Sequence, residues 1–202
     1  MQNRCVTIDR QYGSGGREVG RRLAKKLGIP CYGKELLLIT ASDYGVDLGK
    51  LKEMDEKRTG SILHDIAEFT FGLQNYNKMM EPVDLYKEVN QTIVKLSKKG
   101  PCVFIGRCAD VALQEVSSPL KVFVYATSME ERIRRVREED QVEDTNIEKY
   151  ILKKDEYRQG YYDHFSGKTW GDMKSYDICL NTTAFGYDRC VDVLADLLGD
   201  QA

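Results

Sequence analysis

The first thirty residues follow the pattern of a strand, a loop and an amphipathic helix. Residues 5–8 are a short apolar run, and the polar segment 9–12 ends it before the glycine-rich loop 13–16. From Arg17 onward, apolar residues recur at helical spacing on one face, and basic residues occupy the other. Gly28, followed at once by Ile-Pro, ends this helix. The order strand, glycine loop, helix predicts the opening of a βαβ unit.

Three later apolar runs have the character of strands that are buried on both faces. They span residues 102–105, 121–125 and 176–180. Each run is nearly continuous in apolar residues instead of alternating with polar ones, which is typical of parallel strands covered by helices on both sides. We therefore predict a parallel sheet.

Helical patterns lie between and after these runs. Residues 85–96 carry an apolar stripe at helical spacing. Ser128 begins a capping box that opens a basic helix, and Thr145 begins a second one, which opens a helix through about residue 161. An amphipathic stretch over 190–198 closes the chain.

This alternation of strands and helices predicts an α/β three-layer sandwich with a parallel sheet. The length of 202 residues fits one domain over 1–202. Its core is expected at 1–44, 83–137 and 173–202. Two stretches do not fit the sheet, namely about 45–82, which we predict to be a helical insertion, and about 138–172, which is charged and rich in tyrosine.

Composition and charge narrow the function classes. Hydrophobic residues make up 42% of the chain and charged residues 31%, which excludes wholesale disorder. The net charge of −2 is not that of a general nucleic-acid coat or a polybasic membrane binder, so we expect neither partner and a locally held anionic ligand. No apolar run approaches the roughly 18 residues of a membrane span, and residues 1–5 lack the apolar stretch of a signal peptide. We expect a cytoplasmic protein.

Cysteine and histidine usage gives no sign of a metal centre. The six cysteines form no Cys-x-x-Cys pair, and only two histidines are present. A structural zinc site has little material here, and we expect reduced, mostly buried thiols that behave as small core residues.

The loop at 13–16 has the chemistry of an anion site. A glycine loop between a strand and a helix places bare backbone N–H groups and the positive end of the helix dipole around an anion. The usual phosphate-loop pattern is G-x-x-x-x-G-K-[ST]. Aligned on residues 10–17, Arg10 stands at the first glycine, Gly16 at the lysine and Arg17 at the hydroxyl residue. The pattern is not met, and a glycine-rich turn without a ligand stays open as the alternative.

The residues around the loop carry a resemblance to a known family. Residues 8–28 resemble the start of bacterial cytidylate kinases, and more closely the cytidylate kinase-like branch, whose loop is Tyr-Gly-Ser-Gly-Gly-Arg-Glu. The similarity continues through 32–37, 106–110 and 161–171, and it ends at 176–182. It implies the fold of P-loop NTPases of the nucleoside monophosphate kinase type. In that fold the helical insertion binds the acceptor and residues 138–172 form a lid that excludes water.

The resemblance implies ATP as the phosphoryl donor, with Mg²⁺ bridging its phosphates. The residues that it places around the ATP phosphates are Gly13, Ser14, Gly15, Gly16, Arg17 and Glu18. Arg17 is the nearest cation to take the catalytic role of the missing lysine, and the alternative is a solvated arginine of the first helical turn. Glu18 either helps to hold Mg²⁺ or favours the helix N-terminus, and we prefer the second. We expect the loop's backbone to need the glycine at 16.

On the acceptor side, Arg107 matches the arginine of the family's Gly-Arg-Asp motif, which implies contact with the monophosphate at a strand end. The aspartate of that motif is Cys108 here. Asp110 either substitutes for it or faces solvent. Lys34 lies in another matching segment and is expected to bind the same substrate.

In the lid, Asp155 and Arg158 have the spacing of the family's Asp-x-x-Arg. This implies a phosphate contact for Arg158 and a ribose or cytosine contact for Asp155, with Lys154 as a further lid cation. The alternative is an ion pair at i, i+3 on a helix surface. Four arginines at 132, 134, 135 and 137 lead into this segment, and they form either a solvated face or part of the lid's positive charge.

Three functions follow from these residues. The first is ATP-dependent phosphoryl transfer to a nucleoside monophosphate, most simply CMP or dCMP. The second is a nucleotide-binding regulatory module without kinase activity, for which the absent lysine argues. The third is a small-molecule kinase of the same fold with another acceptor, for which the insertion at 45–82 argues. The residues assign neither a metal ligand nor an oligomeric state.

Overall fold

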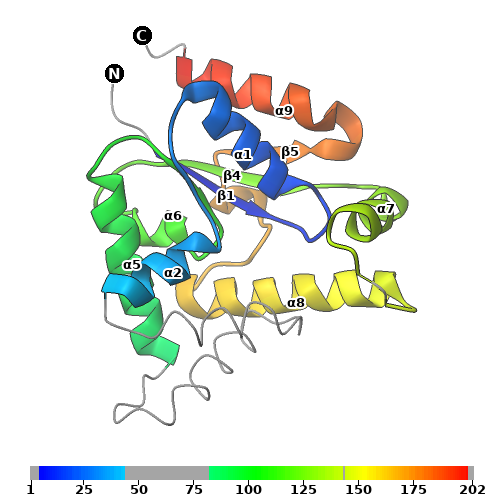
Figure 1. Cartoon of the computed structure of the whole chain (residues 1–202), viewed down its shortest axis with the longest axis horizontal. Coiled ribbons are helices and arrows are strands. Elements are labelled where there is room, and N and C mark those ends of the chain that lie inside the picture. The colour runs from blue at the N-terminus through cyan, green and yellow to red at the C-terminus, as the bar shows by residue number, and fades with distance from the viewer. Residues whose placement is uncertain (1–4, 44–81, 143, 200–202) are drawn as a thin grey trace.

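The computed structural model describes residues 5–43, 82–142 and 144–199. Its centre is a five-stranded sheet in the order β2-β3-β1-β4-β5, in which every paired strand is parallel (Figure 1). The strands are β1 (Val6–Arg10), β2 (Cys31–Tyr32), β3 (Val103–Ile105), β4 (Leu120–Tyr125) and β5 (Ile178–Asn181). The predicted parallel sheet is therefore confirmed, with β1 in the middle.

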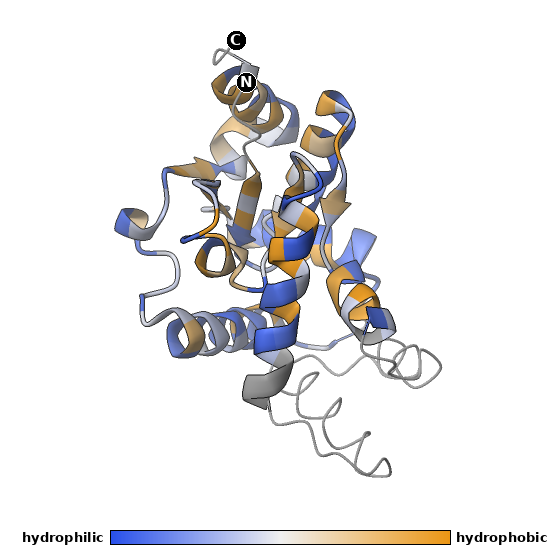
Figure 2. Cartoon of the chain, turned by 90° about the vertical axis from the view of Figure 1, so that its left-hand side faces the viewer, coloured by the Kyte–Doolittle hydropathy of each residue, from blue (hydrophilic) through white to orange (hydrophobic). Residues whose placement is uncertain are grey.

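Helices cover both faces of this sheet. They are α1 (Gly16–Leu27), α2 (Glu35–Asp43), α5 (Pro82–Ser97), α6 (Ala109–Ala112), α7 (Met129–Glu139), α8 (Ile147–Ser166) and α9 (Thr182–Gly199), with a 3₁₀ turn at Met173–Ser175. Figure 2 shows strands that are mainly hydrophobic and helices around them that carry both hydrophobic and hydrophilic residues. Among the described residues, no helix combines the length and the apolar character that crossing a membrane would need.

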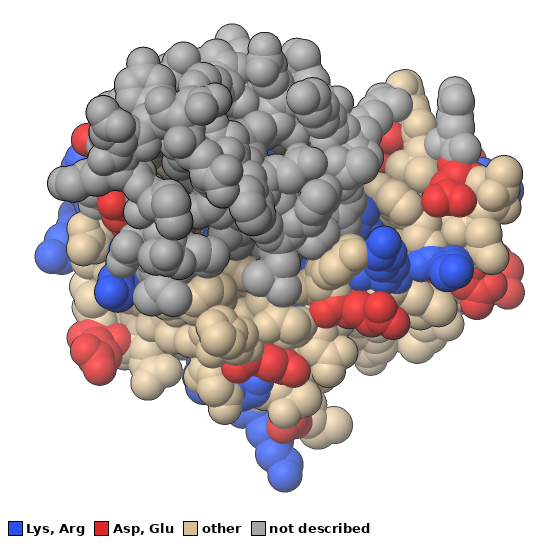
Figure 3. All heavy atoms as spheres, turned by 90° about the horizontal axis from the view of Figure 1, so that it is seen from below, with Lys and Arg blue, Asp and Glu red and all other residues tan. Residues whose placement is uncertain are grey.

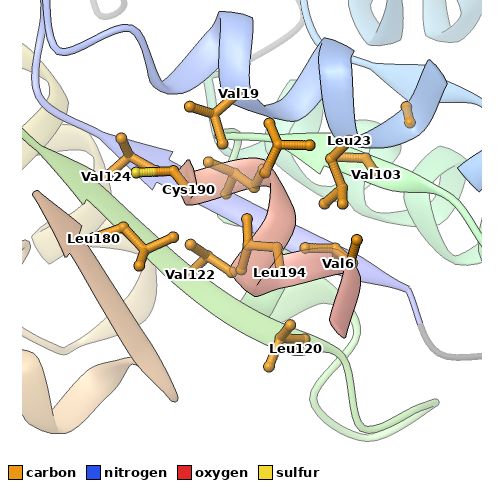
Figure 4. Close-up of a cluster of buried hydrophobic side chains, with 14 of the residues drawn as sticks. Val6, Val19, Leu23, Val103, Leu120, Val122, Val124, Leu180, Cys190 and Leu194 are labelled. Carbon is orange, nitrogen blue, oxygen red and sulfur yellow. The ribbon is translucent and has the colours of Figure 1, made fainter. Parts of the chain in front are cut away.

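The two faces have separate cores. On one face α1 and α9 pack over the central strands, where Val19 and Leu23 meet Cys190 and Leu194 above Val122 (Figure 4). On the other face α2, α5, α6 and α8 pack against the strands around Phe104 and Phe123. This arrangement is the three-layer α/β sandwich predicted from the apolar runs. It leaves the carboxyl ends of the strands at one edge of the sheet.

Several predicted boundaries need correction. β1 continues to Arg10, two residues beyond the predicted apolar run. Ser128 caps α7 as predicted, and its side chain accepts a hydrogen bond from the Glu131 N–H. The N-cap of α8 is Asn146, not Thr145, because the Asn146 side chain accepts from the N–H three residues on. β2 was not predicted, since two residues show no periodicity.

The predicted lid segment has two parts with different surroundings. Tyr161 and Tyr162, in the second half of α8, are buried in the core around Phe104 and Phe123. The first half of α8 packs with α7 in a small separate cluster of Val136, Ile147 and Ile151. The predicted insertion at 45–82 lies outside the described residues except for its last residue, where α5 begins.

Candidate phosphate-binding site

The site is built at the carboxyl end of β1, where the chain turns into α1. Gly15 is the N-cap of α1 with φ of 79°, and no side chain caps the helix there. The first N–H groups of a helix have no partner within it, so this end is open to an anion. A Cβ at Gly15 would lie 2.3 Å from the Tyr187 ring, and both this approach and the positive φ require glycine.

Ser14 supports the loop from behind. Its side chain is buried, and Oγ lies 2.8 Å from the Gln11 carbonyl and 3.1 Å from the Val124 carbonyl. The Ser14 carbonyl accepts from the Thr182 hydroxyl at 2.8 Å, which ties the loop to the start of α9. The Ser14 N–H donates to Gln11 at 3.3 Å. Ser14 thus fixes the loop's shape, and the structure does not present its hydroxyl to a ligand.

A buried ion pair fixes the other side of the loop. Arg132 of α7 is 4% exposed, donates from Nε to the Tyr12 carbonyl at 2.7 Å, and pairs with Asp155 of α8. The Tyr12 N–H donates to the same carboxylate at 2.6 Å. One oxygen of Asp155 therefore accepts from the loop and the other from Arg132, and we call the Arg132–Asp155 pair the clamp. Its ion-pair partner is Arg132, not Arg158 one turn on, so the alternative of an i, i+3 ion pair is wrong. The ribose or cytosine contact of Asp155 stays a prediction.

Several arginines converge beside the loop. Arg158 donates from a terminal nitrogen to the Arg10 carbonyl at 2.9 Å, and its guanidinium lies 5.0 Å from the Tyr12 ring centre. Burial lowers the pKa of the Arg10 guanidinium, and repulsion from Arg158, Arg107 and Arg17 lowers it further, while Asp9 opposes the shift. Four arginines therefore lie close together in the part of the chain that the structure describes, with Asp9 beside Arg10 and Asp155 near Arg158.

The turn after β3 is strained. Gly106, Arg107 and Cys108 have φ of 70°, 62° and 51°, so two residues with side chains adopt the left-handed region. Each such residue costs on the order of 1 kcal/mol or more. One terminal nitrogen of Arg107 is buried, and it finds no hydrogen-bond partner within the part of the chain that the structure describes. A buried unpaired guanidinium nitrogen is unusual in proteins, and an anion would satisfy it.

A small recess lies beside Arg107, lined by Asp9, Asp110 and Tyr176 among others. Oδ2 of Asp9 accepts from the Trp170 indole at 2.9 Å and faces the Tyr176 hydroxyl at 3.5 Å. Asp110 is 7% exposed and accepts from the Tyr162 hydroxyl at 2.9 Å. The expectation that Asp110 faces solvent was one of two alternatives, and the structure excludes it.

Three other predicted residues lie at the margin of this site. Glu18 forms an ion pair with Arg22 one turn on, at 2.7 Å, which fits a helix-surface role better than a metal ligand. Lys34 is exposed and follows β2 at the same edge of the sheet. Lys154 lies with its ammonium 5.9 Å from the Tyr12 ring centre. Seen from below, basic side chains lie among acidic ones on this face of the molecule (Figure 3).

Sequence reasoning missed Asp9, Arg10 and the clamp role of Arg132. The available signal was position, because Asp9 and Arg10 follow the apolar part of β1 directly, where open α/β sheets bind ligands. Among the described residues, no group of three or more His, Cys, Asp or Glu side chains is placed to hold a metal ion. Protein-bound Mg²⁺ often takes most of its ligands from phosphates and water.

The residues present fit a polyphosphate. The glycines of the loop leave the first turn of α1 open, and Arg107 holds a buried nitrogen without a partner. The four arginines supply a local excess of positive charge. Phosphate oxygens would satisfy the open N–H groups and this excess of charge together.

The sequence matches the family described as the cytidylate kinase-like family over residues 5–184. Among solved structures, an uncharacterized protein from Eubacterium ventriosum ATCC 27560 aligns with a TM-score of 0.70 and 23% identity, covering 97% of this chain and 98% of that one. Shikimate kinase from Bacteroides thetaiotaomicron aligns with a TM-score of 0.56 and 13% identity, covering 97% of this chain and 98% of that one. A gluconokinase from Sinorhizobium meliloti 1021 aligns with a TM-score of 0.51 and 13% identity, covering 99% of this chain and 98% of that one. These likenesses show an α/β kinase fold. No curated protein matches the sequence.

Proposed function

The chain belongs to the cytidylate kinase-like family, and from that premise we propose that it transfers the γ-phosphoryl group of ATP to a nucleoside monophosphate, CMP or dCMP. An acceptor phosphate oxygen forms the new bond to the γ-phosphorus while the bond to the β,γ-bridging oxygen breaks, giving a diphosphate and ADP. The protein's task is to hold the two nucleotides in line and to stabilise the charge on their oxygens.

The donor phosphates bind at the loop. The loop at 13–16 and the first turn of α1 surround them, and Arg17 contacts them from the helix start. Mg²⁺, when bound, neutralises charge between the phosphates. The chain's own part is to fix the loop, which Ser14 and the Arg132–Asp155 pair do from two sides.

The acceptor phosphate binds at Arg107, with Lys34 and Asp110 as further contacts to the acceptor. The unpaired nitrogen of Arg107 supports this assignment, because a monophosphate oxygen is the kind of partner that it lacks. Arg158 approaches the loop from α8 through its bond to the Arg10 carbonyl and contacts phosphate between donor and acceptor.

The observation that carries the proposal is the meeting of Arg10, Arg107 and Arg158 beside open helix amides. These cations come from different elements, and their mutual repulsion is unfavourable without an anion. A site for a neutral or cationic ligand gains nothing from such an arrangement.

The lid belongs to the proposal in a narrower form than residues 138–172. The candidate lid is α7 with the first half of α8, which pack together around Ile151 and contact the loop at Tyr12. The second half of α8 is expected to stay with the sheet, since Tyr161 and Tyr162 are buried in its core.

The test is a coupled assay for ADP release over nucleoside monophosphates, with shikimate and gluconate added because kinases for these compounds share the fold. Turnover with CMP or dCMP supports the proposal. Turnover only with a small hydroxyl compound makes the protein a small-molecule kinase. Tight ATP binding without turnover on any acceptor makes it a nucleotide-binding module. The control variant is Arg134→Ala, on the exposed face of α7, which we expect to leave turnover unchanged.

A further inference from the structure

Two positions of the loop depart from the usual phosphate-loop pattern together. That pattern has glycine at its first position and, six residues later, a lysine that reaches the β- and γ-phosphates. This chain has Arg10 at the first position and Gly16 at the other. The loop has therefore lost a cation at one end and gained one at the other.

The structure shows that the two positions contact each other. A Cβ built on Gly16 would lie 2.5 Å from Cβ of Arg10 and 3.0 Å from its Cγ. The stem of Arg10 thus occupies the space in which a side chain at 16 would begin. Gly16 has no positive φ, so the expectation that the backbone needs glycine there is wrong. Arg10 makes the closest steric contact with a side chain at Gly16, and Cβ of Val124 lies 3.0 Å from the same position.

The far end of Arg10 points to the same site. Its terminal nitrogen lies 2.2 Å from the position of a Cβ on Gly106, so the side chain extends from the end of β1 past Gly16 to the end of β3. The guanidinium is 3.6 Å from Asp9, and the Arg10 side chain is 18% exposed. It lies between the loop and the turn that carries Arg107.

We propose that Arg10 takes the place of the phosphate-loop lysine, and that arginine at 10 and glycine at 16 are a coupled exchange that moves one positive charge from the end of the loop to its beginning. The inference rests on the proposed function for its phosphates, and it replaces Arg17 in the lysine's role. Arg17 stays a phosphate contact at the helix start, and its charge also acts on Cys31 and Glu35 near β2.

The surroundings of Arg10 favour an anion over an empty site. Arg17, Arg107 and Arg158 all repel its charge, and Asp9 is its ion-pair partner among the described residues. The negative oxygens of a bound phosphate chain would attract all of these arginines and offset their mutual repulsion. Each arginine can donate to phosphate oxygens with two nitrogens at once.

The test is a cycle of three variants, Arg10→Gly, Gly16→Lys and the double variant that restores the usual pattern. The readouts are the melting temperature, the ADP and tripolyphosphate affinities by calorimetry, and ATP turnover. Arg10→Gly is expected to fold and to bind ADP at least about tenfold more weakly, the scale of one charge-assisted contact. Gly16→Lys is expected to lower the melting temperature, because its Cβ collides with the arginine stem. The double variant is expected to regain stability and most of the affinity.

Recovery of ADP affinity in the double variant would show that Arg10 acts on the phosphates through its charge, which the lysine at 16 also supplies. If Arg10 only packed against its neighbours, the lysine at 16 would not restore the affinity. Arg10→Lys, with the charge kept on a similar stem, is expected to fall between wild type and Arg10→Gly. Wild-type ADP affinity in Arg10→Gly, or no recovery in the double variant, would overturn the inference. A wild type that binds ADP without turnover contradicts the proposed kinase function alone. A wild type that binds neither ADP nor tripolyphosphate contradicts both.

Discussion

The indole nitrogen of Trp170 donates a 2.9 Å hydrogen bond to the carboxylate of Asp9, 161 positions earlier in the chain. The Trp170 ring also packs edge-on against Phe123 of β4, with ring centres 5.3 Å apart. The segment after α8 is thereby fixed to the end of β1, directly beside Arg10.

We expect Trp170→Phe to lower the free energy of unfolding by roughly 1 kcal/mol, because one donor to a half-buried carboxylate is lost while the ring contact is kept. Urea unfolding measures the change. Met173→Ala, at a side chain that is 73% exposed, is the matched control and should leave stability unchanged. Equal losses in both variants would show that the bond to Asp9 contributes nothing of its own.

Breaking the Arg132–Asp155 pair should lower the free energy of unfolding by more than Trp170→Phe does. Arg132→Leu leaves Asp155 without its buried partner, so we expect a loss of about 3–5 kcal/mol in the free energy of unfolding. Arg134→Leu, two residues along the same helix and exposed, should change it by less than about 0.5 kcal/mol. Denaturant unfolding of the two variants decides between a buried clamp and a solvated arginine face.

At Arg107, stability and function are expected to move in opposite directions. Arg107→Gly relieves a left-handed backbone and should raise the free energy of unfolding by about 1 kcal/mol. It also removes the guanidinium proposed to bind the acceptor, so KM for the monophosphate should rise. Arg107→Ala, which keeps the strain, should lose function without gaining stability. A stabilised variant with an unchanged KM would remove Arg107 from the acceptor site.

Burial of Asp110 makes the stability of the folded protein depend on pH in a predictable direction. Burial raises the pKa of its carboxyl above the ordinary value of about 3.9, and the neighbouring charge of Asp9 adds to the rise. The folded state therefore binds more protons than the unfolded chain above that pH, and the contribution of Asp110 to stability is lost as pH rises. Asp110→Asn should become more stable relative to wild type between about pH 4 and pH 7. Urea unfolding over this range would contradict the prediction if the difference stayed constant.

Nucleotide binding should slow hydrogen exchange in one part of the predicted lid only. α7 and the first half of α8 contact the loop through Arg132 and Asp155, so their amides should exchange more slowly with ATP bound. Residues 161–166, already in the core, should not change. Slower exchange over all of 138–172 would favour the longer lid predicted from the sequence. Unchanged exchange throughout this segment would contradict the presence of a lid.

The sequence was sufficient for the elements whose side chains repeat regularly. Continuous apolar runs predicted β3, β4 and β5, because a strand covered on both faces has no polar side to show. The cap of α8 could not be chosen between Thr145 and Asn146, since both residue types cap helices and only the geometry selects one.

The site was predictable where it depends on local order and not where it depends on tertiary contact. Strand, glycine loop and helix were predicted in this order, and the structure has β1, the loop and α1 there. That Asp155 would be held by Arg132, or that Arg10 would lie against Gly16, depends on elements that meet only in the folded chain. Spacing alone therefore assigned to Arg17 a role that we propose for Arg10.

The four arginines at 10, 17, 107 and 158 come from β1, α1, the turn after β3 and α8. A partly folded chain carries all four arginines but does not bring them together, so the proposed polyphosphate binding requires the complete fold. Multivalent anions should accordingly stabilise the folded chain against unfolding, because they screen the repulsion among these arginines. The same repulsion makes the ligand-free protein sensitive to the ionic composition of its surroundings at one particular place, the carboxyl edge of β1.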